Sequence, residues 1–259
     1  MRFRPCWLRY GAAVLCVLTV CVLSRAVPFA GRAVDDLKEL SELLKRPRAE
    51  RVLSQESAAR CLEAPSGDEA GGPWPYMCRA ILLAYAEDEK ATHFLEERYK
   101  KYSDPSHWVA GPTAYALTIR GLRERTDEEA FSILCFRLGR SPHPFERMMI
   151  ANRLWADYGA KAEWAIYEAA KAETSPLAKL DLLYYVSRTK NVALARAAVA
   201  SDWSACDSEI PEDYAYFLAL ITPGRTGWYD HRLRIALVEA LARTAGAAPD
   251  APSGPKPRE

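Results

Sequence analysis

Apolar residues recur at helical spacing along most of the chain, in pairs of runs. The first run of each pair begins at a proline, and these prolines lie 37, 32, 32 and 35 residues apart. They are Pro75, Pro112, Pro144, Pro176 and Pro211. Proline suits the first turn of a helix, because its missing N–H would have no partner there in any case. The pattern therefore predicts a helix that begins near each proline.

A second helical run follows each proline-led run. The expected second helices cover residues 88–102, 127–139, 160–173, 191–200 and 228–244. Runs with the alternating pattern of β-strands are nearly absent. A period of about 30–40 residues built from helix pairs is typical of an α-solenoid. We therefore predict an all-α fold, an α-solenoid of about five antiparallel helix pairs, with an irregular helical bundle as the alternative.

The run after Pro144 is apolar around most of its circumference. On a helical wheel Glu146, Arg153 and Asp157 share one narrow side, and apolar residues fill most of the rest. A helix that is apolar nearly all round is covered by neighbours on most sides. We expect this helix to lie in the middle of a stack, with Trp155 buried and the three charged residues exposed.

The order of proline, apolar first helix, short turn and alanine-rich second helix resembles HEAT-like repeats over about residues 75–244. The resemblance implies stacked helix pairs that bind another protein along a continuous surface, without catalysis. Tetratricopeptide repeats have a similar period, but they carry small residues where this chain has Asn152, Trp164 and Lys171. A tetratricopeptide-like adaptor is the second possibility.

The N-terminus has the features of an export signal. Residues 1–11 are basic, and residues 12–23 are a run of 12 apolar residues. That run is shorter than the ~20 residues that cross a bilayer as a helix, and it suits the core of a signal peptide. Cleavage after Ala26 would release an exported protein, periplasmic or secreted. An uncleaved membrane anchor formed by residues 1–26 is the alternative.

Three further segments flank the repeats. Residues 33–63 have helical periodicity and form a lead-in, and residues 64–74 are a loop rich in glycine and proline. The repeat domain is expected over residues 75–245. Residues 246–259 are rich in proline and lack aromatic residues, so we expect a disordered tail.

Charge gives no sign of a nucleic-acid partner. The net charge of the chain is +1, and 31 basic and 34 acidic residues remain when residues 1–26 are set aside. A nearly neutral body does not carry the excess of positive charge that phosphate backbones attract. The expected partner is therefore an unidentified protein.

Four cysteines lie beyond residue 26: Cys61, Cys78, Cys135 and Cys206. Cys61 and Cys78 flank the loop at 64–74, and a disulfide between them would clamp two helices. Buried free thiols are the alternative, since cysteine packs as a small hydrophobic residue. No two of these cysteines have the CxxC spacing of a zinc or redox motif.

Catalytic motifs are missing from the sequence. The histidines are scattered; His93 and Glu97 share a helix face without a second pair of ligands, and His143 lies in a turn, where we expect a cap or a surface position. We therefore predict no catalysis, no cofactor and no metal. The alternative is an extracytoplasmic helical enzyme that acts on a polymer such as a glycan through paired acids. The acids available are Glu96, Glu97, Glu128 and Glu129.

One tryptophan stands apart from the apolar pattern. If Ala162, Ile166 and Ala169 face the core, then Trp164, Glu168 and Lys171 share the opposite side of their helix. An exposed tryptophan between charges is typical of a binding anchor, so these three are the candidate partner-binding residues. Packing of Trp164 into the next repeat is the alternative.

Overall fold

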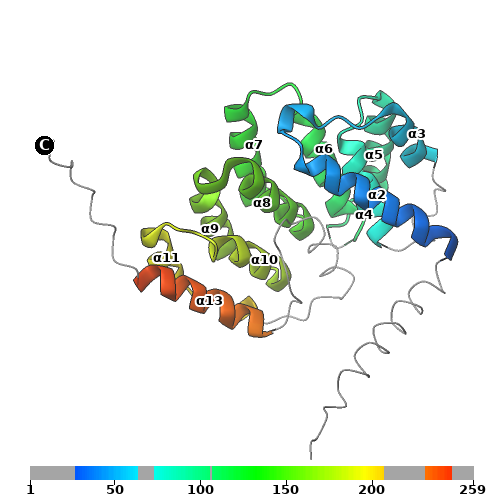
Figure 1. The fold of residues 1–259 in the computed structure, drawn as a ribbon. Coiled ribbons are helices and arrows are strands. Elements are labelled where there is room, and N and C mark those ends of the chain that lie inside the picture. The colour runs from blue at the N-terminus through cyan, green and yellow to red at the C-terminus, as the bar shows by residue number, and fades with distance from the viewer. Residues whose placement is uncertain (1–26, 64–72, 106, 207–230, 247–259) are drawn as a thin grey trace, which may run out of the picture.

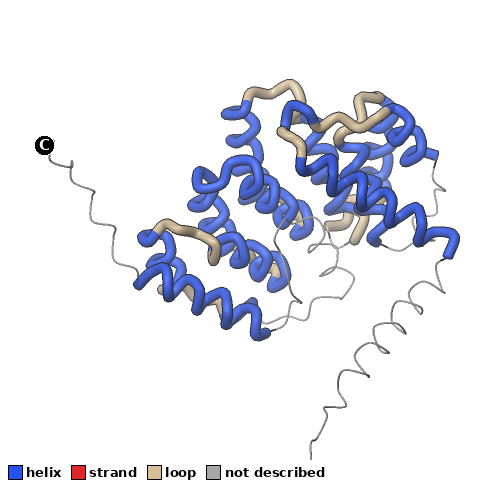
Figure 2. The backbone as a smooth tube through the Cα atoms, in the orientation of Figure 1, coloured by secondary structure: helices blue, strands red, loops and turns tan. Residues whose placement is uncertain are grey.

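The computed structural model describes residues 27–63, 73–105, 107–206 and 231–246 (Figure 1). Within these ranges the chain is helical and has no β-strand, apart from one isolated bridge between Leu53 and Ala86 (Figure 2). The predicted all-α class is confirmed. Residues 1–26, most of the loop, the run from Pro211 and most of the tail lie outside the described residues. Among the described helices, none combines the length and apolarity needed to span a membrane.

The lead-in forms two helices joined by a short 3₁₀ turn. The first helix buries Leu37, Leu40 and Leu43 on one side and packs against the first proline-led helix (Figure 1). It begins at Val27, six residues before the periodicity predicts. The elements are α2 (Val27–Lys45), η1 (Arg48–Glu50) and α3 (Gln55–Glu63).

Prolines and capping residues explain where several of the later helices begin. Pro144 and Pro176 occupy the first turns of their helices, as expected. Thr126 and Glu129 form a capping box, in which each side chain binds the other's backbone N–H. The helices are α4 (Pro73–Ala84), α5 (Glu89–Lys101), α6 (Ala110–Gly121), α7 (Asp127–Arg140), α8 (Pro144–Tyr158), α9 (Glu163–Ala172), α10 (Pro176–Val186), α11 (Val192–Val199) and α13 (His231–Gly246), with 3₁₀ turns η2 (Gly159–Ala162) and η3 (Ser204–Cys206).

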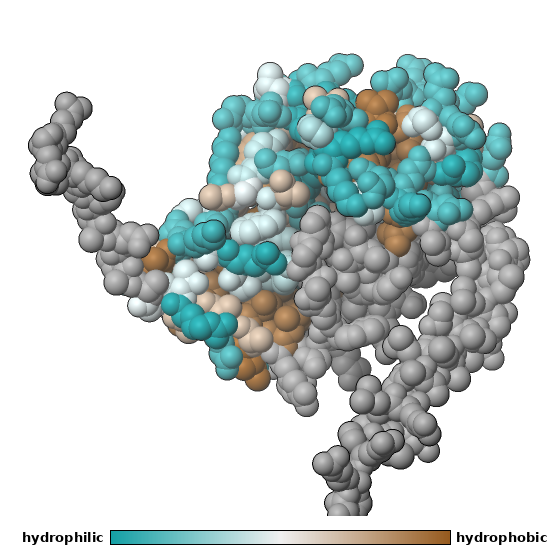
Figure 3. Space-filling model, viewed as in Figure 1, coloured by the Kyte–Doolittle hydropathy of each residue, from teal (hydrophilic) through white to brown (hydrophobic). Residues whose placement is uncertain are grey.

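Consecutive proline-led helices lie side by side. Helix α4 packs on α6, α6 on α8, and α8 on α10, so these helices form one row (Figure 1). Three of the second helices pack most closely on the proline-led helix that follows them: α5 on α6, α7 on α8, and α9 on α10, whereas α11 packs most closely on α13. These closest pairs join a second helix to the next proline-led helix. The sequence predicted pairs of a proline-led helix and the second helix that follows it. On the face shown in Figure 3, hydrophilic residues cover most of the N-terminal half, and hydrophobic residues gather near α13.

Helix α8 is enclosed on its charged side as well, contrary to the sequence prediction. Trp155, expected to be buried, is only partly buried, and its ring centroid lies 6.1 Å from that of Tyr185. The expected exposure of Glu146, Arg153 and Asp157 is wrong, because all three side chains are largely or fully buried. Each is held by an oppositely charged side chain, and some of these come from other elements. Ion pairing thus offsets the cost of removing these charges from water.

Close contact between α6 and α8 depends on a glycine. A Cβ atom added at Gly111 would lie 2.7 Å from the Cβ of Phe145. A Cβ atom is fixed to the backbone, so it can move away only if helix α8 moves. At Gly121, the last residue of α6, an added Cβ would meet no atom within 4 Å. The two glycines of one helix therefore provide a matched pair of positions.

Gly111→Ala is expected to lower the free energy of unfolding by about 1–3 kcal/mol, because it forces α6 and α8 apart. Gly121→Ala, the control, should leave it unchanged or raise it by up to ~1 kcal/mol through the lower entropy of the unfolded chain. Urea unfolding followed by circular dichroism measures both. Equal stabilities of the two variants would show that the helices do not meet at Gly111.

Candidate functional site

Helix α9 presents an aromatic residue to solvent between two charges. Trp164 is 45% exposed, and its ring meets that of Tyr167 edge to face at 5.7 Å. Lys171 Nζ lies 3.4 Å from a Glu168 carboxylate oxygen and 5.2 Å from the Tyr167 ring centroid. The structure therefore places Trp164, Glu168 and Lys171 together on the exposed side of α9, and we call these three residues the Trp164 surface. Helix α7, which packs on α9, also exposes Phe136.

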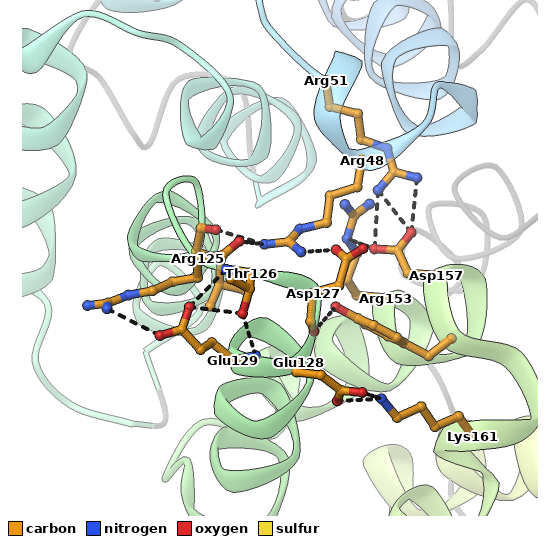
Figure 4. A network of polar contacts seen from close by, with 12 residues as sticks. Arg48, Arg51, Arg125, Thr126, Asp127, Glu128, Glu129, Arg153, Asp157 and Lys161 are labelled. Atoms are coloured by element: carbon orange, nitrogen blue, oxygen red, sulfur yellow. Dashed lines mark hydrogen bonds and ion pairs between the residues drawn. The ribbon is translucent and has the colours of Figure 1, made fainter.

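A second candidate site is a pocket of about 340 Å³ where η1 meets the turn between α6 and α7 and the C-terminal end of α8. Arginines from three separate segments line it, and Figure 4 shows four of them beside their partners. They are Arg48 and Arg51 from the lead-in, Arg123 and Arg125 from the turn, and Arg153 from α8. We call this site the arginine pocket.

Two of these arginines share one carboxylate. Arg51 donates from both terminal nitrogens to Asp157 Oδ1, each at 3.1 Å, and Arg153 Nε lies 2.8 Å from Asp157 Oδ2 (Figure 4). All three side chains are buried. Burial raises the pKa of Asp157, and the charge and hydrogen bonds of Arg51 oppose that rise. The lead-in is thereby joined to α8 by a buried ion pair.

Arg48 fastens the lead-in at a second point. Its guanidinium donates to the backbone carbonyl of Leu122 at 2.8 Å and to that of Arg125 at 3.1 Å, and it pairs with Asp127 (Figure 4). Asp127 is itself largely exposed, so water competes for this ion pair. The two carbonyl contacts therefore do most to fix the position of Arg48.

A separate ion-pair cluster surrounds Glu146, which is 0% exposed. Arg137 donates to it from Nε at 3.0 Å and from Nη2 at 2.6 Å and 2.9 Å. Thr118 donates at 2.8 Å, and Ser141 donates to the second carboxylate oxygen. Because these protein donors occupy both oxygens, we assign Glu146 a structural role.

The other acidic and histidine candidates lie on the surfaces of α5 and α7. Glu128 pairs with Lys161 at 2.6 Å, and Glu129 closes the capping box, while Glu96 and Glu97 are exposed on α5. His93 is exposed on the same helix. No group of three or more metal-binding side chains occurs in the part of the chain that the structure describes.

His143 is the N-cap residue of α8, so the expected cap position is confirmed, whereas a surface position is not. Its side chain is buried, makes no capping hydrogen bond to α8, and has its Nε2 3.2 Å from the Tyr99 hydroxyl. Burial lowers the pKa of His143, which favours the neutral ring that this environment accommodates. The tyrosine comes from α5, so the sequence around the turn carried no sign of it.

Cys61 and Cys78 are buried free thiols on α3 and α4. They lie close enough for Cys61 to contribute to the raised pKa of Cys78. Burial raises the pKa of Cys61 to about 12, so its thiol is protonated and unreactive at neutral pH. The disulfide between them is not formed in this structure and stays a prediction for the oxidised protein. Cys206 is also a buried free thiol, and Cys135 is a half-buried one.

The Trp164 surface and the arginine pocket thus remain as candidate sites, built from different elements. The first was identified from the sequence; the second was not, because its residues are brought together only by the fold. Comparison of the chain with family models, with curated proteins and with solved structures finds no match.

Proposed function

We propose that the protein is a HEAT-like helical-repeat scaffold that binds another protein and has no catalysis of its own. Residues 1–26 direct it to export or tether it to a membrane. The row of helices α4, α6, α8 and α10, with α9 exposing an aromatic anchor beside it, is the observation that supports this proposal. Stacked helix pairs offer a continuous surface on which a partner can contact several repeats.

The Trp164 surface has the properties of an interface centre. Binding energy in interfaces concentrates on a few residues, among which tryptophan, tyrosine and arginine are enriched. The edge-to-face contact with Tyr167 restrains the Trp164 ring before binding, which lowers the entropy that association would cost. Glu168 and Lys171 supply both signs of charge beside it, and such charges select a partner more than they add affinity.

The proposal is tested by site-specific photocrosslinking of the full-length chain in the cells that make it. A photoreactive residue at position 164 is expected to capture a defined partner, and one at position 235 is not. Ile235 on α13 is 47% exposed, close to the value for Trp164, so it is the matched control. With the purified partner, Trp164→Ala should weaken binding at least tenfold, as hot-spot residues do, and Ile235→Ala should leave it unchanged.

Equal crosslinking at the two positions, or equal affinity of Trp164→Ala and the unsubstituted chain, would overturn the role of the Trp164 surface. The same preparation tests export. Recovery outside the cytoplasm, with Val27 as the first residue, supports a cleaved signal. Recovery of the full-length chain in the membrane supports an anchor, and recovery from the cytoplasm contradicts both.

A further inference from the structure

The arginine pocket holds more positive than negative charge. Five arginines line it, against the three carboxylates of Glu87, Asp127 and Asp157. Asp157 is shared by Arg51 and Arg153, so one carboxylate serves two guanidinium groups. The lining therefore carries two more positive than negative charges, and Arg125 also pairs with Glu129 outside it. Such an excess favours an anionic ligand.

Arg123 has the most capacity for a ligand. Its Nη2 donates to the backbone carbonyl of Ala84 at 3.0 Å, and it forms no ion pair with a carboxylate of the described residues. A guanidinium has five N–H donors, so most of those of Arg123 are available. Arg123 is exposed at the pocket wall, so a ligand from solution can reach these donors.

Tyr85 supports one of the arginines. It lines the pocket, and the Arg153 guanidinium lies over its ring at 5.9 Å from the centroid. Its hydroxyl is buried beside Tyr115 and is not exposed in the pocket. Tyr85 therefore contributes its ring, and not its hydroxyl, to the lining.

The rest of the lining is apolar and sets the size of the ligand. Five aliphatic side chains contribute to it: Ala49, Val52, Ile119, Leu122 and Leu134. The volume of about 340 Å³ lies near the lower end of the ~300–1,000 Å³ common for small-molecule sites. Inorganic phosphate would leave most of this space and the whole apolar wall unused. The dimensions suit an anionic group attached to a small organic part.

We propose that the arginine pocket binds a small organic phosphate monoester. The phosphate lies against Arg123 and Arg153, and the organic part lies against the aliphatic wall. A phosphate monoester carries a charge of about −1.5 to −2 near pH 7, which matches the excess in the pocket. Guanidinium groups bind its oxygens through paired, charge-assisted hydrogen bonds. The Trp164 surface is on a different helix, and the proposal does not depend on it.

Isothermal titration of the full-length chain with phenyl phosphate tests this assignment. Inorganic phosphate and the dicarboxylate phthalate serve as comparison ligands at constant ionic strength. Phenyl phosphate is expected to bind more tightly than either, because only it combines the phosphate with an apolar group. Arg123→Gln should weaken its binding about tenfold or more, and Arg123→Lys, which keeps the charge but loses the paired donors, about threefold or more. Arg188→Gln, which removes an exposed arginine outside the pocket, should have no effect.

Folding of the variants is checked by their melting temperatures. Arg123 is exposed, so both variants should melt close to the unsubstituted protein. If one variant melts at a lower temperature, the binding measured with the other variant tests the proposal. Absence of phenyl phosphate binding at millimolar concentration overturns the proposal, as does tighter binding of phthalate. Equal affinities of the two pocket variants and Arg188→Gln would also overturn it, since the ligand would then bind elsewhere.

Discussion

Replacement of Arg137 by alanine is expected to lower the free energy of unfolding by about 3–5 kcal/mol, the range typical when one partner of a buried ion pair is removed. Arg137 donates three hydrogen bonds to Glu146, and Glu146 has no contact with solvent. Without Arg137 the carboxylate keeps only the hydroxyls of Thr118 and Ser141. Two neutral donors do not replace a full positive charge. Urea denaturation of the purified chain measures the loss.

A second substitution distinguishes the effect of the unpaired Glu146 charge from the effect of losing the Arg137 side chain. Arg137→Ala combined with Glu146→Gln should recover most of the stability, because glutamine keeps the shape of the side chain without its charge. Arg140→Ala is the control, since Arg140 is exposed on the same helix, and it should change stability by no more than ~0.5 kcal/mol. A loss in the double variant as large as in Arg137→Ala would place the cost in packing around Arg137 and not in the charge of Glu146.

Arg51→Ala is expected to cost about 3 kcal/mol and to loosen the lead-in selectively. Arg51 connects the segment between α2 and α3 to Asp157 on α8, and both side chains are buried. Hydrogen exchange should therefore increase in residues 46–63 more than in α8 or α10. Arg125→Ala is the control, because Arg125 is half exposed and lies 3.9 Å from an equally exposed Glu129. It should change stability little, as surface ion pairs do.

The loss caused by Arg51→Ala should depend on pH. Burial already raises the pKa of Asp157, and Arg51 is the main group that opposes this rise. Without Arg51 the pKa rises further above that of the unfolded chain. The folded variant then takes up a proton that the unfolded chain does not, so its deficit should shrink as the pH falls from 7 toward 4. A deficit that stays constant over this range would contradict an electrostatic origin.

The positions of the helices could be predicted from local sequence alone. Proline at residues 144 and 176 and the capping residues Thr126 and Glu129 act within one turn of the chain, so their effect does not depend on tertiary contacts. Trp164 could be placed on an exposed face because its neighbours on α9 are small apolar residues with a regular period. These features can be recognised from the sequence of a single helix.

The burial of charged residues could not be predicted in the same way. A helical wheel predicts that Asp157 is exposed, because it considers only residues of the same helix. The partner that buries Asp157 is Arg51, 106 residues earlier in the chain. The arginine pocket has the same origin, since its arginines are spread over three segments that meet only in the folded state. A charged residue on an otherwise apolar helix is a sign of such a pair, but it does not identify the partner.

The contact between Arg51 and Asp157 also has a consequence for the order of folding. Contacts between residues distant in sequence form late, because a long loop must close before they can contribute. The lead-in is synthesised before the rest of the described structure, yet Arg51 cannot bind until α8 exists. The segment at η1 should therefore be the first part of the described fold to be made and one of the last to be fixed in place.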